Sequence, residues 1–248
     1  MSLADFGRTA AIVTIGDEVV EGRVSNQNAE WLSGQLLRRG FWPRLVIAVP
    51  DDEALIVRLL RIAADSANVV IICGGLGFTP DDITRRAVAG AFFRSLTVDQ
   101  VVASAVLATS SWATSEIAEA IATFPRGSVP VLSSCGGVPG FHMPGVFALP
   151  GSPREMRSMF SGMPLPVNDP HIVTATLSCT GTEDTIHDVL LRFEVVHSDV
   201  RLGSYPDYEC EEPSVGIVLA SRSSAALEGA RSWLIAELHG QVVSRVDL

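Results

Sequence analysis

The chain has 248 residues, of which 18 are basic and 28 are acidic, so its formal net charge at pH 7 is −10. Hydrophobic residues make up 47% of the chain and charged residues 19%, a balance that excludes an intrinsically disordered protein. Every basic residue is an arginine, which excludes mechanisms that need a Schiff-base lysine or a Walker-type phosphate lysine. The acidic excess excludes a general nucleic-acid binder, because affinity for phosphate backbones depends on basic side chains.

The apolar runs are short, and none is long enough to span a bilayer. Asp5 and Arg8 precede the first apolar stretch, which is not the pattern of a secretory signal. The cysteines and histidines show no zinc-ligand spacing. We therefore expect a cytoplasmic protein with reduced thiols and no membrane partner.

The first part of the chain alternates short apolar runs with amphipathic segments of helical length. In chain order we expect strands over 11–15, 45–49 and 69–73, and helices over 26–39, 52–65 and 81–93. Helices over 98–108 and 115–124 then lead to strands over 129–132 and 146–149 and a short helix over 154–160. Continuous apolar strands separated by helices indicate an α/β domain, here over residues 1–163, whose parallel sheet is covered on both faces.

Two prolines within residues 163–166 predict a linker, because proline cannot continue a helix. After it we expect a strand over 171–179, a helix over 182–196, strands over 200–205 and 214–220, a helix over 223–238 and a strand over 240–246. This β-α-β-β-α-β order predicts a small α+β domain of the ferredoxin-like split βαβ type over residues 167–248.

A glycine-rich loop, residues 74–84, follows the third strand and enters a helix. Gly74, Gly75 and Gly77 would let the backbone approach a ligand closely, and the helix N-terminus would offer free N–H groups to a phosphate. Thr79 is a further candidate ligand contact. The alternative is a tight strand-to-helix turn that Thr79 or Asp81 caps.

Asp81 and Asp82 in this loop have two interpretations. Carboxylates in the first turn of a helix are favoured by its dipole and need no function. Two carboxylates beside a phosphate pocket would, however, repel an anion unless a divalent cation bridges them. Both residues are therefore candidate metal ligands.

Two other turns are expected at the same edge of the sheet, because the carboxyl ends of parallel strands lie together. Glu18 could bind a metal or a ribose hydroxyl, and Asn26 and Asn28 could hydrogen-bond a ligand, although Ser25 or Asn26 could simply cap a helix. The third turn supplies backbone and side-chain groups for a phosphate from Gly151, Ser152 and Arg154.

These three turns resemble the family of the N-terminal half of the competence/damage-inducible protein CinA, within the MoaB/MogA-like molybdopterin-binding superfamily. Residues 16–28 follow the pattern G-x-E-x-x-x-G-x-x-x-N-x-N, and residues 150–156 follow P-G-x-P-x-E-M. Residues 74–84 follow G-G-L-G-P-T-x-D-D-x-T, with Phe78 in place of the proline. Residues 203–206 resemble a motif of the CinA middle domain.

The resemblance implies a three-layer α/β domain with a parallel or mixed sheet, homo-oligomers with a dimer favoured, and an anionic ligand at the glycine loop. It implies an enzyme that uses Mg²⁺, Mn²⁺ or Co²⁺ to hydrolyse ADP-ribose to AMP and ribose 5-phosphate. Asp82 aligns with the superfamily's D-x-T signature, so we expect Asp82 and Glu18 to be catalytic, with Thr84 as the partner of Asp82. The alternative is a protein that binds molybdopterin or a nucleotide without hydrolysing it.

Overall fold

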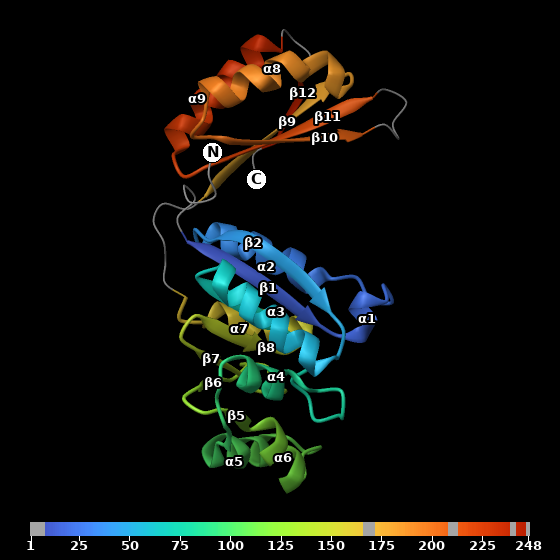
Figure 1. Ribbon diagram of the computed structural model, residues 1–248, viewed down its shortest axis with the longest axis vertical. Coiled ribbons are helices and arrows are strands. Elements are labelled where there is room, and N and C mark those ends of the chain that lie inside the picture. Colours follow the sequence, from blue (N-terminus) through green and yellow to red (C-terminus); the bar gives the residue numbers. More distant parts are fainter. Residues whose placement is uncertain (1–7, 166–171, 208–212, 239–241, 247–248) are drawn as a thin grey trace. The chain divides into compact units, whose positions relative to one another are not determined.

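The computed structural model describes residues 8–165, 172–207, 213–238 and 242–246 (Figure 1). Within these residues the chain forms two compact units. The larger comprises residues 8–36 and 42–165, and the smaller comprises residues 37–41 and the described residues after 171. The domains expected over 1–163 and 167–248 include stretches that lie outside the described residues, so their boundaries stay predictions.

The larger unit is built on a six-stranded sheet with the strand order β2-β1-β3-β8-β7-β6. Its strands are β1 (Thr9–Ile15), β2 (Trp42–Val49), β3 (Val69–Cys73), β6 (Val129–Val131), β7 (Gly140–Met143) and β8 (Val146–Leu149). The first four in the sheet order are parallel, whereas β7 and β6 pair antiparallel. Every residue of β1, β3 and β8 is buried, which explains their continuous apolar runs.

Helices cover both faces of this sheet (Figure 1). On one face, α3 (Glu53–Ser66) and α4 (Thr84–Ala91) share a buried cluster with the strands, to which Ile56, Val88 and Ile72 contribute. On the other face, α2 (Gln27–Arg38) and α7 (Pro153–Ser161) contact each other through the rings of Trp31 and Phe160, whose centroids are 5.3 Å apart. The expected three-layer α/β fold with a mixed sheet is confirmed.

Some short elements were not predicted from the sequence. They are α1 (Asp17–Val20), the strand β7, and the pair β4 (Leu96–Val98) and β5 (Thr123–Pro125). α5 (Gln100–Thr109) and α6 (Ser115–Ile121) lie between β4 and β5 in the chain. The helix expected over 115–124 ends early because residues 123–125 pair with β4 instead.

The smaller unit has the element order predicted from the sequence. Its elements are β9 (Val173–Thr180), α8 (Glu183–Val196), β10 (Arg201–Asp207), β11 (Ser214–Ser221), α9 (Ser224–Glu237) and β12 (Val242–Val246). The strands pair antiparallel in the order β10-β11-β9-β12. Leu177, Phe193, Ile217 and Leu234 lie in its core. This arrangement confirms the small split βαβ domain.

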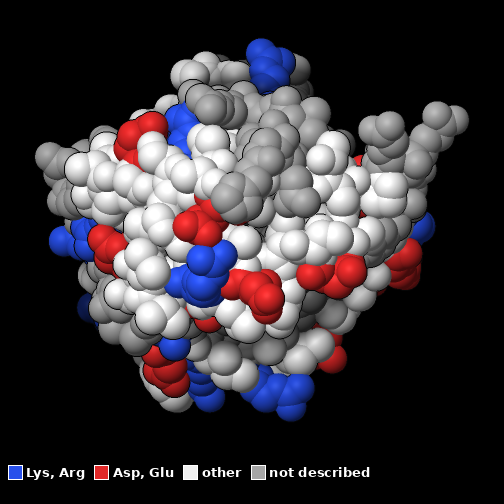
Figure 2. Space-filling view, turned by 90° about the horizontal axis from the view of Figure 1, so that it is seen from above, with Lys and Arg blue, Asp and Glu red and all other residues white. Residues whose placement is uncertain are grey.

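The described surface carries charges of both signs close together. On the face shown in Figure 2, Arg side chains lie near Asp and Glu side chains. In the smaller unit, Arg192 of α8 and Glu237 of α9 form an ion pair at 2.8 Å. Among the described helices, none is long and apolar enough to cross a membrane.

Candidate functional site

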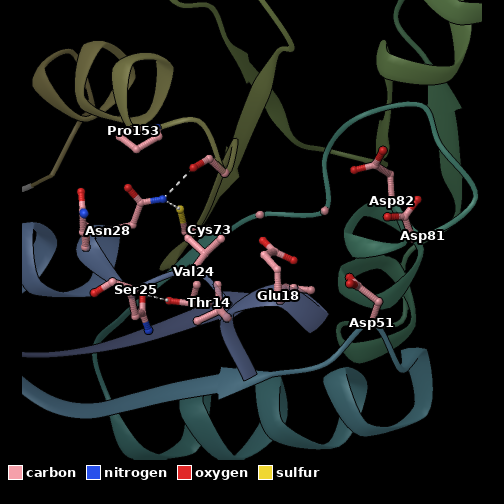
Figure 3. A pocket seen from close by; sticks show the side chains of 18 residues that line it. Thr14, Glu18, Val24, Ser25, Asn28, Asp51, Cys73, Asp81, Asp82 and Pro153 are labelled. Carbon is pink, nitrogen blue, oxygen red and sulfur yellow. Dashed lines mark hydrogen bonds between the residues drawn. The ribbon is translucent and has the colours of Figure 1, made fainter. Parts of the chain in front are cut away.

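A cavity of about 290 Å³ opens at the carboxyl ends of β1, β2, β3 and β8 (Figure 3). The expectation that the turns after β1, β3 and β8 meet is therefore correct. Most of the site residues predicted from the sequence line this cavity: Glu18, Asn26, Asn28, Gly74, Gly75, Asp81, Asp82 and Gly151. The others are not among its lining residues: Gly77, Thr79, Thr84, Ser152 and Arg154.

The cavity is acidic on one side. Glu18, Asp51, Asp81 and Asp82 lie on that side in Figure 3, opposite Asn28. No Arg is found among the described lining residues. An anionic ligand would therefore meet unbalanced negative charge unless a cation accompanied it.

Asp82 holds the loop that precedes it. Its Oδ1 accepts a hydrogen bond from the N–H of Gly77 at 2.6 Å. Its Oδ2 accepts hydrogen bonds from the N–H and the hydroxyl of Thr79, at 2.8 and 2.5 Å. A carboxylate offers about four acceptor positions, so these three bonds leave roughly one for a ligand.

The start of α4 differs from the prediction. The helix begins at Thr84 rather than at residue 81, so Asp81 and Asp82 precede it and do not lie in its first turn. The alternative interpretation, in which Thr79 or Asp81 caps the helix, is also wrong, since Ile83 occupies the N-cap without a side-chain bond. The physical reason is the turn that Asp82 closes, in which its N–H also donates to the Thr79 carbonyl at 3.0 Å.

The glycine loop approaches other parts of the chain closely. A Cβ on Gly74 would lie 2.1 Å from the Ile15 carbonyl oxygen. Gly75 has φ +62°, and a Cβ there would lie 2.4 Å from Oγ1 of Thr84. The buried Thr84 hydroxyl also donates to the Gly74 carbonyl at 2.8 Å. Close packing at the carboxyl ends of the strands therefore requires glycine at both positions. The Thr84 hydroxyl, which is buried beneath the loop, fixes the Gly74 carbonyl.

One backbone donor at this loop is available to a ligand. Gly75 lines the cavity, and its N–H donates no hydrogen bond to the described residues. Gly151 lies beside Gly74, since a Cβ on Gly151 would be 3.5 Å from the Gly74 Cα. Gly151 also precedes the N-terminus of α7, where Pro153 occupies the first turn. The backbone of Gly74, Gly75 and Gly151 therefore forms an uncharged region of the cavity wall.

The two asparagines have different local roles. Oδ1 of Asn26 accepts from the Ala29 N–H at 3.3 Å, so Asn26 caps the start of α2 while it lines the cavity. The buried Asn28 donates from Nδ2 to the Gly151 carbonyl at 2.7 Å and to Sγ of Cys73 at 3.1 Å. Its Oδ1 has no hydrogen-bond partner among the described residues.

Ser152 and Arg154 lie outside the cavity lining. Ser152 occupies the N-cap of α7 without a side-chain cap bond, and both residues are exposed. The proposed phosphate contact of Arg154 therefore has no support from this geometry, and the role stays a prediction.

Two ionisable residues of the cavity lining, Asp51 and Cys73, were missed by the sequence analysis. Asp51 follows the end of β2 and exchanges backbone-to-side-chain hydrogen bonds of 3.0 Å with Asp17. Cys73 is the last residue of β3, and its thiol donates to the Pro150 carbonyl at 3.3 Å. The position of Asp51 after a parallel strand was the signal that could have found it.

Burial raises the pKa values of both missed residues. Partial burial raises the pKa of Asp51; the Asp17 backbone N–H opposes this, and the nearby carboxylates add to it. Burial raises the pKa of the Cys73 thiol to about 12. Hydrogen bonding by Thr79 lowers the pKa of the exposed Asp81, which favours its ionised form.

Behind the loop lies Arg85, which the sequence did not mark. It is only 5% exposed, and its guanidinium donates from Nη1 to the carbonyls of Leu76 and Gly77 at 2.6 and 3.2 Å. Nη2 donates to the carbonyls of Ile121 and Pro139 at 2.9 and 3.3 Å. The side chain thus joins the glycine loop to the end of α6 and to the segment before β7.

Comparison with known proteins assigns the chain to a family. Residues 11–168 match the family described as a probable molybdopterin binding domain. The chain belongs to this molybdopterin-binding-domain family. Residues 171–247 match the middle domain of FAD synthase.

Individual relatives extend this result. A protein of Archaeoglobus fulgidus is 31% identical over 195 residues, covering 79% of this chain and 84% of the relative. A CinA-like protein of Syntrophus aciditrophicus is 30% identical over 253 residues, covering 95% of this chain but only 58% of the relative. The crystal structure of CinA from Thermoplasma acidophilum, a protein titled as of unknown function, has a TM-score of 0.60 and 28% identity. That match covers 64% of this chain and 96% of the other.

Proposed function

We propose that the cavity binds an ADP-ribose-like nucleotide with a divalent cation and hydrolyses its pyrophosphate bond. Water would add to one phosphorus as the bridging P–O bond breaks, giving AMP and ribose 5-phosphate. The observation that carries this proposal is the acidic lining beside a backbone donor, Gly75, with no basic side chain among the described lining residues. A diphosphate could enter such a cavity only with a cation.

The donor set of the cavity fits a hard divalent cation. Its side chains offer carboxylate oxygens from Glu18, Asp51, Asp81 and Asp82. Among the described residues, no three His, Cys, Asp or Glu side chains lie close enough to hold a metal ion unaided. Magnesium-like ions are commonly held by one or two carboxylates together with substrate phosphates, so the remaining ligands would come from the nucleotide and water.

Glu18 and Asp82 would have different roles. Glu18 folds back over Gly16, and its carboxylate accepts no hydrogen bond from the described residues, so it is the free ligand of the pair. Asp82 would contribute its remaining acceptor position while it keeps Gly77 and Thr79 in place. A bound Mg²⁺, Mn²⁺ or Co²⁺ would supply charge neutralisation and activation of water.

The chain's own groups would orient the nucleotide. The free N–H of Gly75 would donate to a phosphate oxygen. Asn28 lies on the side of the cavity opposite the carboxylates (Figure 3), and Asn26 also lines the cavity. Both side chains would contact the ribose or the base.

We also propose that the protein is a homo-oligomer, with a dimer favoured, and that its location is cytoplasmic. Light scattering after gel filtration tests the former.

A second candidate is binding of molybdopterin or a nucleotide without hydrolysis. The observation that favours it is the occupation of the Asp82 carboxylate, which already accepts three hydrogen bonds. Such a protein would form a stable complex at the same cavity and release no product.

The test is AMP release from ADP-ribose by the purified protein with Mg²⁺, Mn²⁺ or Co²⁺. We expect cation-dependent AMP formation that Glu18→Gln abolishes. Glu21→Gln is the matched control, because Glu21 is exposed, pairs with Arg23 and does not line the cavity. Absence of AMP with every cation would contradict hydrolysis, and a stable nucleotide complex would then support the second candidate.

A further inference from the structure

The peptide group between Leu76 and Gly77 is held at both ends. Its carbonyl oxygen accepts a hydrogen bond from Nη1 of Arg85 at 2.6 Å. Its N–H, on the opposite edge of the planar trans peptide, donates to Oδ1 of Asp82 at 2.6 Å. Arg85 and Asp82 therefore fix the orientation of one peptide from opposite sides, and any rotation of it would break both bonds.

Arg85 is itself anchored in the core. Its second nitrogen, Nη2, donates to the Ile121 and Pro139 carbonyls, and its guanidinium carbon lies 5.8 Å from the centre of the Phe124 ring. These partners lie outside the glycine loop, so the orientation of the guanidinium is set independently of any ligand.

The charge of Arg85 has no ion-pair partner among the described residues. All its hydrogen bonds go to neutral carbonyls, and Nε is buried without a partner. Burial lowers its pKa to about 10, against the attraction of Asp82, so the group is charged at neutral pH. A buried, unpaired charge is costly, and a neutral side chain would serve packing alone better.

We propose that Arg85 is a positioning residue of this site: through the Leu76–Gly77 peptide it fixes the Asp82 carboxylate at the cavity, and its charge offsets part of the acidic lining. The proposal rests on the proposed function only for the identity of the ligand. The geometric part concerns the ligand-free protein, and it can be tested whether or not the protein hydrolyses ADP-ribose.

The variants separate charge from geometry. Arg85→Lys keeps the charge but cannot reproduce the fork that spans four carbonyls, and Arg85→Met removes both. The matched control is Arg86→Gln, because Arg86 is the next residue of α4, is exposed and pairs with Glu53. Thermal unfolding of each variant establishes that it is folded before the other measurements.

The first readout is hydrogen exchange of the Gly77 and Thr79 amides, resolved by NMR, in the ligand-free protein. We expect both amides to exchange roughly tenfold faster or more in Arg85→Lys, relative to amides of β1 in the same sample. Arg86→Gln should match the wild type. If Arg85→Met does not fold, Arg85→Lys alone decides this point.

The second readout is cation-dependent ADP-ribose binding, followed by steady-state kinetics if AMP is released. We expect Kd, and KM with it, to rise roughly tenfold or more in Arg85→Lys, with a larger loss in Arg85→Met. Normal Gly77 exchange and normal affinity in folded Arg85→Lys would overturn the proposal. Faster exchange in Arg85→Lys, with no nucleotide binding even by the wild type, would support the positioning and reject the proposed function.

Discussion

The carboxamide of Asn28 on α2 donates a hydrogen bond of 2.7 Å to the carbonyl of Gly151, which precedes α7. The two residues are 123 positions apart in the sequence. The same Nδ2 contacts Sγ of Cys73 at the end of β3. One buried side chain thus connects three of the segments that enclose the cavity. Loss of its hydrogen bonds would therefore both destabilise the protein and change the shape of the cavity.

Replacing Asn28 by Ala is therefore expected to affect both stability and binding. The part-buried hydrogen bond to the Gly151 carbonyl is lost, which should lower the free energy of unfolding by about 0.5–1.5 kcal/mol. Chemical denaturation measures this loss, and nucleotide titration should show weaker binding. Glu30→Ala on the exposed face of α2 is the control. Unchanged stability in Asn28→Ala would show that the contact contributes nothing.

Gly75→Ala tests whether the glycine loop needs its backbone conformation. Gly75 has φ +62°, and the new Cβ would press against Thr84 Oγ1 at 2.4 Å. We expect a loss of at least about 1–2 kcal/mol in stability and a loss of ligand binding. Gly34→Ala is a matched control, since Gly34 lies within α2 with open space around its Cβ position. That control should be neutral or stabilising.

The cysteines should differ sharply in reactivity with pH. Burial raises the pKa of the Cys73 thiol to about 12, so very little thiolate is present at pH 8. Cys135 is exposed and free. We expect an alkylating reagent at pH 8 to modify Cys135 quickly and Cys73 only after unfolding, as peptide mass spectrometry would show. Rapid labelling of Cys73 in the folded protein would contradict the buried position.

Asp51 should make stability depend on pH in a defined direction. Because its folded-state pKa lies above the ordinary value, its contribution to stability is present at low pH and is lost as the pH rises through that pKa. Asp51→Asn should therefore melt at a higher temperature than the wild type at pH 7 without cation. The difference should shrink as the pH falls towards about 4.

Cation binding should reverse the order of the two melting temperatures at pH 7, so that the wild type melts above Asp51→Asn. A divalent cation would stabilise the wild type more than Asp51→Asn, because the variant offers one carboxylate less. Calorimetric melting with and without Mn²⁺ measures both effects. A larger stabilisation of the variant by Mn²⁺ would argue against Asp51 as a cation ligand.

Much of the fold could be predicted from local patterns. The buried strands β1 and β3 are mostly or wholly apolar, and the helices that follow them are amphipathic. These patterns were enough to predict the parallel strands and the convergence of their loops at one edge of the sheet. The short strands β4, β5 and β7 have three or four residues each, too few for a periodic signal.

The finer structure of the site depends on contacts that periodicity does not encode. Asp82 bonds back to Gly77 and delays the start of α4, and this bond depends on the whole conformation of the loop. The buried Arg85 side chain donates hydrogen bonds to the carbonyls of Ile121 and Pro139, which are far from it in the sequence. Arginine in the first turn of a helix ordinarily suggests a solvated side chain, so no local signal marked it.

The central claim is that the acidic cavity accepts a diphosphate only together with a divalent cation. It is tested most directly by calorimetric titration of ADP-ribose into the cation-free protein and into the protein saturated with Mn²⁺. We predict no binding without the cation, binding with it, and loss of the cation-dependent binding in Glu18→Gln. Binding of equal affinity in the presence of a chelator would contradict the claim, because no bridging cation would then be needed.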